Sequence, residues 1–92
     1  MVPDRQTALN LLDKYISNEN MKKHCLASEA VMRKVAEHLG RDKEKWGVTA
    51  LLHDLDTEVV DNDPNTHALK TAEILSEMGV DEDMTDAIRM HN

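Results

Sequence analysis

Apolar residues recur at helical spacing along most of the chain. In the first such segment Ala8, Leu9, Leu12, Tyr15 and Ile16 lie three or four positions apart, which is the pattern of an amphipathic helix. No stretch alternates Val, Ile and Thr for long enough to predict a strand. The sequence therefore predicts an all-α fold, a compact bundle of about five helices. The expected helices cover residues 5–17, 21–39, 42–55, 67–78 and 82–92.

Residues that favour helix ends stand at these boundaries. Short polar side chains can accept hydrogen bonds from first-turn N–H groups, and glycine readily adopts the left-handed conformation that ends many helices. The acidic segment 56–65, which contains Pro64, is predicted to be a loop. The expected N-caps are Asp4, Asn20, Asp42, Thr66 or Asn65, and Asp81, and the expected C-terminal stops are Gly40 and Gly79.

A chain of 92 residues corresponds to at most one domain, so we predict a single helical domain over residues 1–92. The last apolar pattern, with Met84, Ala87 and Ile88, is still running at Asn92 and has no stop signal. We therefore expect the domain to lack its C-terminal helices. Met84 and Ile88 are then expected to form an exposed apolar strip, through which the chain could form a homo-oligomer.

Composition and charge narrow the range of partners. The formal net charge is −7, and the chain has no Phe, one Trp and one Tyr. Both features argue against binding a nucleic-acid polymer, which needs cationic and often aromatic side chains. A small phosphate ester remains compatible, because a bound divalent metal ion would invert the local charge.

The cellular setting is predicted from what the sequence lacks. Cys25 is the single cysteine and cannot form an internal disulfide, and the first residues do not have the pattern of a signal peptide. No apolar run approaches the ~20 residues that cross a bilayer. We expect a cytoplasmic protein with no membrane partner.

The apolar run of the third segment ends abruptly at His53 and Asp54. Carboxylates are almost never fully buried unless they are paired or bind a metal ion. Neighbouring helical side chains diverge by about 100°, yet both could reach one ion beyond the helix end, where the helix dipole favours a cation. The alternative is that both residues are simply the first polar positions after the helix leaves the core.

The other histidines bear on this choice. His24 and His67 are expected near helix N-termini, where the dipole favours the neutral ring that a metal ion requires. Each histidine also has an explanation that involves no metal ion. His24 could be an exposed helix residue, His67 a turn residue, and His91 could interact favourably with the C-terminal end of its helix. We assign His38 to such a helix-end position and Cys25 to core packing.

Four stretches, KKHCLASEAV, ALLHDLDTE, NTHALKTAEIL and AIRMHN, together resemble the HD-domain superfamily of metal-dependent phosphohydrolases. The likeness runs from about residue 21 to the end, is closest to small HDIG-like hydrolases, and depends on the order and spacing of the motifs. It implies an all-α fold in which His24, His53 and Asp54 bind a metal ion, with an Asp on a later helix completing the site. His67 and His91 look like the additional ligands of the two-metal branch.

Some positions depart from the family pattern. No acidic residue follows His91, and Asn92 stands where many two-metal members carry a second adjacent histidine. Whether the site is complete, and whether it binds one or two ions, therefore stays open. Asp56 and Glu58 resemble a sub-pattern of small HD hydrolases, but we assign them no ligand role.

The resemblance implies hydrolysis of a nucleotide or other small phosphate ester by metal-activated water, with Asp54 as the catalytic carboxylate that could bridge two ions. Mixed imidazole and carboxylate ligands suit Mn, Fe, Co, Ni or Zn better than Mg. Lys70 and Arg89 could contact the substrate phosphate, although solvated helix charges are the alternative for both. Two other functions stay open: a di-iron oxygenase, and a catalytically inert helical interaction module.

Overall fold

The computed structural model describes residues 2–58 and 67–90. Within these ranges the chain forms helices and turns and has no strand, which confirms the predicted all-α class. The third helix begins one residue later and ends three residues earlier than expected, and the fourth begins two residues later than expected. The helices are α1 (Arg5–Tyr15), α2 (Glu19–Leu39), α3 (Lys43–Leu52), α4 (Leu69–Glu77) and α5 (Glu82–Met90).

Local capping explains where the first three helices begin. The side chains of Asp4 and Asp42 accept hydrogen bonds from first-turn N–H groups, as predicted. The N-cap of α2 is Asn18 and not Asn20, so that prediction is wrong by two residues. Asn18 Oδ1 accepts from the N–H of Met21 at 3.0 Å, and this bond starts the helix early enough to include Asn20 in its first turn.

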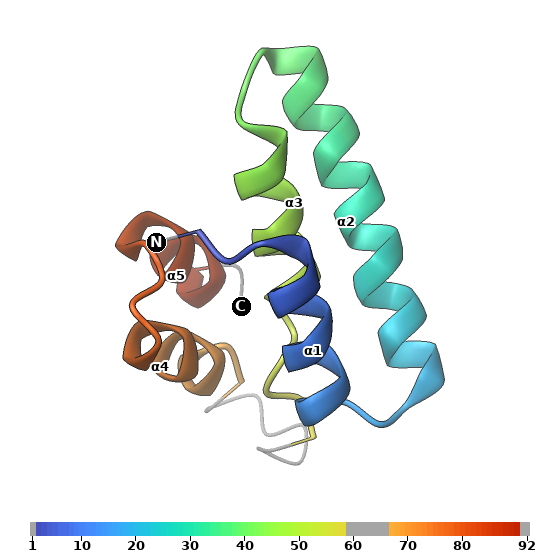
Figure 1. The fold of residues 1–92 in the computed structure, drawn as a ribbon, viewed down its shortest axis with the longest axis vertical. Helices are drawn as coiled ribbons and strands as arrows, with labels where there is room; N and C mark the ends of the chain where they lie inside the picture. Colours follow the sequence, from blue (N-terminus) through green and yellow to red (C-terminus); the bar gives the residue numbers. More distant parts are fainter. Residues whose placement is uncertain (1, 59–66, 91–92) are drawn as a thin grey trace.

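Helix α3 lies at the centre of the fold (Figure 1). The long helix α2 runs beside α3, and α1 and α5 also pack against α3. Helix α4 packs against α5. This central position explains why apolar residues of α3 lie on several sides of the helix and not on one face only. Every helix contributes to the core cluster, and α2 contributes Cys25. The other members include Ala8, Leu12, Ile16, Val48, Leu51, Leu52, Leu55, Leu75, Met84 and Ile88.

The expected exposed strip on the last helix is not found. Met84 is 2% exposed and Ile88 is 1% exposed. Helix α5 packs against both α3 and α4, and this contact turns the two side chains into the core. The prediction that Met84 and Ile88 form an exposed apolar strip is therefore wrong.

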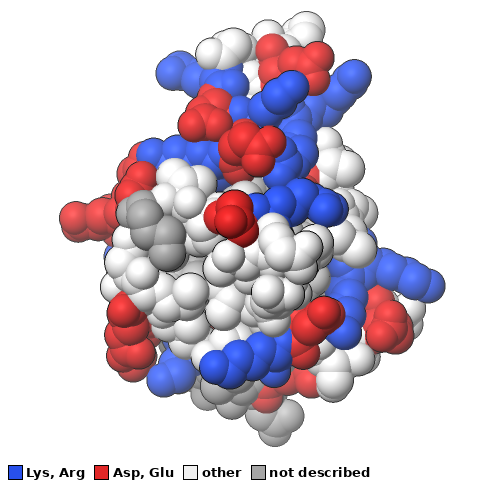
Figure 2. Space-filling model, viewed as in Figure 1, with Lys and Arg blue, Asp and Glu red and all other residues white. Residues whose placement is uncertain are grey.

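The described helices and one face of the surface bear on possible partners. None of the described helices combines the length and the apolar character needed to cross a membrane. Figure 2 shows acidic and basic side chains interspersed around the edge of one face, with uncharged side chains across its centre. Neither sign of charge forms a continuous field on that face.

A buried carboxylate joins α1, α2 and α3. Glu29 is 4% exposed and accepts hydrogen bonds from Arg5 Nε at 2.9 Å and from Arg33 Nη2 at 3.1 Å. Burial alone would raise the pKa of Glu29, but these guanidinium contacts outweigh it and lower the pKa below its usual value. Arg33 also donates to Glu44 at 2.7 Å, at the start of α3. The network therefore sets how α2 lies on α3.

Replacing Gly47 by alanine is expected to destabilise the fold, although the same change in a helix usually stabilises it by about 1 kcal/mol. A Cβ atom at this position of α3 would lie 2.6 Å from Cγ of Arg33, so Arg33 would have to leave Glu29 and Glu44. We expect a loss of about 1–3 kcal/mol in urea denaturation. In an Arg33→Ala background the same substitution should be stabilising, because the clash is gone. Stabilisation by Gly47→Ala alone would contradict this account.

Candidate metal centre

Three side chains, one from α2 and two from the turn that follows α3, meet at the C-terminal end of α3. The chain leaves α3 after Leu52 and enters a turn, so His53 and Asp54 face inward rather than continuing the helix. His24, which is on α2, lies 3.0 Å through Nε2 from Asp54 Oδ2, and His53 Nε2 lies 3.0 Å from the same oxygen. The ligand atoms of the three residues lie within 4.8 Å of one another. The expected convergence of these three residues is thus observed.

His67 reaches the same carboxylate from the other side. Its Nε2 atom lies 3.1 Å from Asp54 Oδ1, whereas the Nε2 atoms of His24 and His53 each lie 3.0 Å from Oδ2. Asp54 therefore has histidine nitrogens at both of its oxygens. His24 is the most exposed of the group, with about half of its side chain accessible, whereas the other side chains are largely buried.

The ring of His53 is held by the helix that precedes it. Its Nδ1 atom lies 2.5 Å from the carbonyl oxygen of Ala50, in the last turn of α3. A carbonyl oxygen can only accept, so Nδ1 must donate its hydrogen there. In the neutral ring this tautomer leaves the lone pair on Nε2, which faces Asp54.

The ring of His67 is held by Asp56, a residue to which the sequence interpretation gave no role. Asp56 is completely buried, and its Oδ1 lies 2.6 Å from His67 Nδ1. Its Oδ2 accepts from the N–H of Thr71 at 2.9 Å, and its own N–H donates to Thr71 Oγ1 at 2.9 Å. A carboxylate that orients a ligand histidine is a common feature of metal sites. Asp56 therefore belongs to the site as the residue that orients His67.

The start of α4 and its cap differ from what the sequence predicted. The described part of the predicted loop, residues 56–58, forms turns, and Asp56 and Thr57 are buried there because Asp56 finds N–H donors inside the fold. Helix α4 begins only at Leu69, after Ala68 with a φ of 72°, and has no side-chain cap at its N-cap position. Its first turn is capped by Asp56 through Thr71 instead of by Thr66 or Asn65, both of which lie outside the described residues. In the sequence, the sign of this role was a second aspartate, Asp56, two positions after Asp54.

The backbone at Ala68 is held in an unusual conformation. A positive φ is rare for a residue with a Cβ atom and costs about 1–2 kcal/mol. Ala68 is completely buried and joins His67 to α4. The Asp56 carboxylate accepts hydrogen bonds from His67 Nδ1 and from the N–H of Thr71, on either side of Ala68, and these bonds hold the chain in this conformation.

Electrostatics favour an anionic Asp54. Burial alone would raise the pKa of Asp54, but the hydrogen bond from His53 and the charges of His53, His67 and His24 lower it to about 2. Burial lowers the pKa of His53, but its contacts with Asp54 and Ala50 outweigh this and raise it. Burial, with the nearby charge of Asp54, raises the pKa of the Cys25 thiol to about 11. Cys25 is fully buried, in agreement with its predicted role in core packing.

The donor atoms fit a divalent metal ion. His53 and His67 must both donate through Nδ1, to a carbonyl and to a carboxylate oxygen, so in their neutral forms both present a lone pair from Nε2. Lone pairs that face a carboxylate repel it unless protons or a cation lie between them. Two ligand atoms that each lie about 2.1 Å from one ion, at right angles to each other, are about 3.0 Å apart. The observed separations of 3.0, 3.0 and 3.1 Å agree with that value.

Of the remaining candidate residues, one lies outside the described ranges and two form ion pairs within their own helices. His91 is not among the described residues, so its predicted ligand role stays a prediction. Lys70 pairs with Glu73 at 3.4 Å and Arg89 pairs with Asp86 at 2.6 Å, each three positions away on its own helix. Glu58 is exposed and accepts from the N–H groups of Ser17 and Asn18, as well as from the Ser17 hydroxyl. His38 is exposed near the end of α2, as its assignment to a helix-end position requires.

The fold and the site define an all-α protein with a histidine and aspartate group of the metal-ligand type. Residues 21–92 match the family model of the HD domain. The chain belongs to this family, whose members are generally metal-dependent hydrolases and typically bind divalent metal ions. No solved structure matches the chain significantly.

Proposed function

We propose that this protein is a metal-dependent phosphohydrolase that acts on a small phosphate ester. One observation carries the proposal: three histidine Nε2 atoms surround the two oxygens of one largely buried carboxylate, Asp54. Two of these rings are fixed from behind, by Ala50 and by Asp56, in the tautomer that metal binding requires. Membership of the HD-domain family supports the same reaction class.

The contacts support a proposed set of ligand roles. His24, His53 and Asp54 would hold one ion, and His67, with His91 by resemblance, would bind a second. Asp54 is suited to bridge two ions because its two oxygens face different histidines. The mixed donor set favours Mn, Fe, Co, Ni or Zn over Mg. When bound, such an ion would polarise a phosphoryl oxygen and lower the pKa of a water ligand from about 15.7 toward 7.

The protein side chains would keep the site ready for this chemistry. Asp54 stays ionised across the physiological range because its pKa is about 2. Ala50 and Asp56 keep the lone pairs of His53 and His67 directed into the site. Lys70 and Arg89 are proposed to contact the substrate phosphate after leaving their partners Glu73 and Asp86, and such exposed ion pairs are weak enough to exchange.

The test compares histidines inside and outside the cluster. Protein purified with added Mn²⁺ or Zn²⁺ is expected to retain metal, measured by elemental analysis, and to release phosphate from an aryl phosphate. His24→Ala should lower metal retention at least tenfold, because loss even of an indirect ligand contact costs 10–100-fold. His38→Ala, on the exposed part of the same helix, is the matched control and should behave as the parent does. Equal metal content in the two variants, or a parent that binds no added metal, would contradict the proposal.

A further inference from the structure

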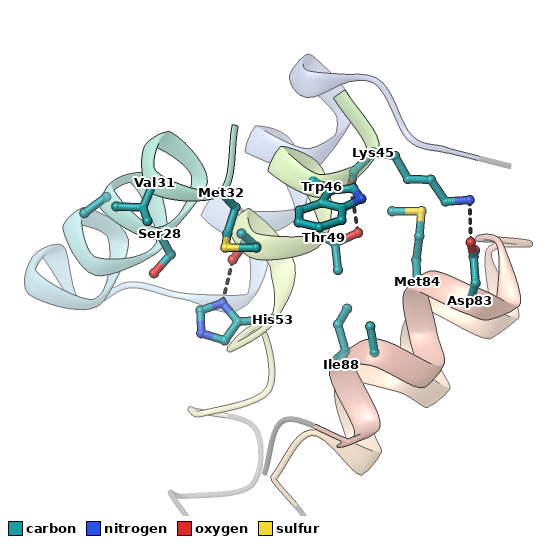
Figure 3. Close-up of a pocket in the computed structure, with 13 residues that line it drawn as sticks. Ser28, Val31, Met32, Lys45, Trp46, Thr49, His53, Asp83, Met84 and Ile88 are labelled. Atoms are coloured by element: carbon teal, nitrogen blue, oxygen red, sulfur yellow. Dashed lines mark hydrogen bonds and ion pairs between the residues drawn. The ribbon is translucent and has the colours of Figure 1, made fainter. Parts of the chain in front are cut away.

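A groove of about 680 Å³ lies between α2, α3 and α5 (Figure 3). Pockets that bind small molecules typically have volumes of about 300–1,000 Å³ and mostly apolar walls. This groove has both properties. Its walls include Val31 and Met32 from α2, Trp46 and Thr49 from α3, and Met84 and Ile88 from α5.

The groove adjoins the candidate metal centre at His53. His53 lines it and also lies 3.0 Å from Asp54. On α3, Trp46 and Thr49 precede His53 by seven and four positions, which places all three on one helical face. On α2, Ser28 and Val31 follow His24 by the same intervals. The two rings are 5.5 Å apart, so both walls of the groove lead to the same pair of histidines.

Charges along the groove indicate what can enter it. Besides His53, the charged lining residues are Lys45 and Asp83, which pair at 2.6 Å and so neutralise each other. Figure 3 shows this pair at the opposite side of the groove from His53. A charged or strongly hydrated group in the middle of the groove would lose water without gaining a partner among the apolar walls. The one part of the groove suited to an anion is the end at the metal centre.

We propose that the groove binds the apolar body of a phosphate monoester, an alkyl or aryl ester, whose phosphoryl group lies beside His53. This inference rests on the proposed function and specifies its substrate class. In the reaction, the bond between phosphorus and the ester oxygen breaks and a bond from phosphorus to the water oxygen forms. One water proton passes to the leaving oxygen, so the products are inorganic phosphate and an apolar alcohol or phenol.

The test uses Trp46, the sole tryptophan of the chain, as a reporter inside the groove. Zinc-loaded protein is titrated with alkylphosphonates of increasing chain length, which cannot be hydrolysed, and tryptophan emission is followed. Affinity should rise about fourfold with each added methylene group until the groove is filled, and ribose 5-phosphate should bind weakly. The emission change should accompany binding of the long chains.

Two phenylalanine variants provide the matched comparison. Ala87 is exposed and lines the groove, whereas Ala30 is exposed on α2 and does not line it. Ala87→Phe should remove the dependence on chain length by filling the groove, and Ala30→Phe should keep it. Zinc affinity is measured in both variants, to show that the metal centre is intact.

Several outcomes would overturn the inference, and they can be separated from failure of the proposed function. If the protein hydrolyses a short phosphate ester but its affinity for alkylphosphonates does not depend on chain length, the phosphohydrolase proposal is supported and the proposed role of the groove is refuted. Equally tight octylphosphonate binding with and without zinc would show an apolar site unconnected to the metal centre. Tryptophan emission that changes with protein concentration alone would show that a second copy of the chain occupies the groove. Absence of both metal and phosphonate binding would refute both proposals.

Discussion

Asp54→Ala is expected to abolish metal retention while leaving the helical content nearly unchanged. Asp54 is the one residue in contact with all three described histidines of the cluster, so its loss removes the shared ligand of the site. We expect a decrease in metal affinity of more than about 100-fold, since changes to mere supporting residues already cost 10–100-fold. Elemental analysis and a competitive zinc titration measure the loss, and far-UV circular dichroism measures the helical content.

The controls for this variant separate a local effect from a general one. Asp86→Ala removes a half-exposed carboxylate from α5 and should leave metal affinity unchanged. Asp54→Asn keeps the shape of the side chain but not its charge, and should also lose most of the metal. Removing the carboxylate leaves His24, His53 and His67 without their shared partner, so the metal-free variant should unfold at a lower temperature than the parent while it keeps its helices at room temperature. Parent-like metal content in Asp54→Ala would refute the assignment of Asp54 as a ligand.

Asp56→Asn is expected to weaken metal binding about 10–100-fold, although Asp56 is not proposed to touch the ion. The aspartate accepts one hydrogen bond at each oxygen, from His67 Nδ1 and from the N–H of Thr71. Asparagine has a single acceptor oxygen, so its amide group would face one of these two donors. The unmatched donor should also cost about 1–3 kcal/mol in the free energy of unfolding.

A second variant distinguishes orientation of His67 from loss of stability. Thr71→Val removes the hydroxyl that accepts from the N–H of Asp56, but it leaves both bonds of the Asp56 carboxylate in place. It should therefore destabilise the protein without the same loss of metal affinity. The His67 ring nitrogens, followed by ¹⁵N NMR, should show the Nδ1–H tautomer in the zinc-loaded parent and in Thr71→Val, and a mixture in Asp56→Asn. Equal losses of metal affinity in Asp56→Asn and Thr71→Val would show that Asp56 stabilises the fold and does not orient His67.

The sequence by itself determined the helices and the core of the candidate site. Apolar spacing in α1 and the caps at Asp4, Asp42 and Gly40 are local features, because each depends on side chains within a few positions of the helix end. The break from Leu52 to His53 and Asp54 identified the candidate ligands, since a buried carboxylate needs a partner. The order of the histidines along the chain then added His24, His67 and His91 to the candidate ligands.

Only the tertiary structure decided how these residues are supported. The sequence placed Asp56 in an acidic loop and gave it no ligand role. In the structure its carboxylate caps α4 through Thr71 and orients His67, contacts that span fifteen and eleven positions. Met84 and Ile88 appeared to be an uncovered strip, yet they are buried because α5 packs on α3 and α4. The groove that leads to His53 needs three helices at once. Local pattern determines whether a segment is helical and which side chains are candidates, whereas burial, orientation and cavities depend on contacts between distant segments, which no local window contains.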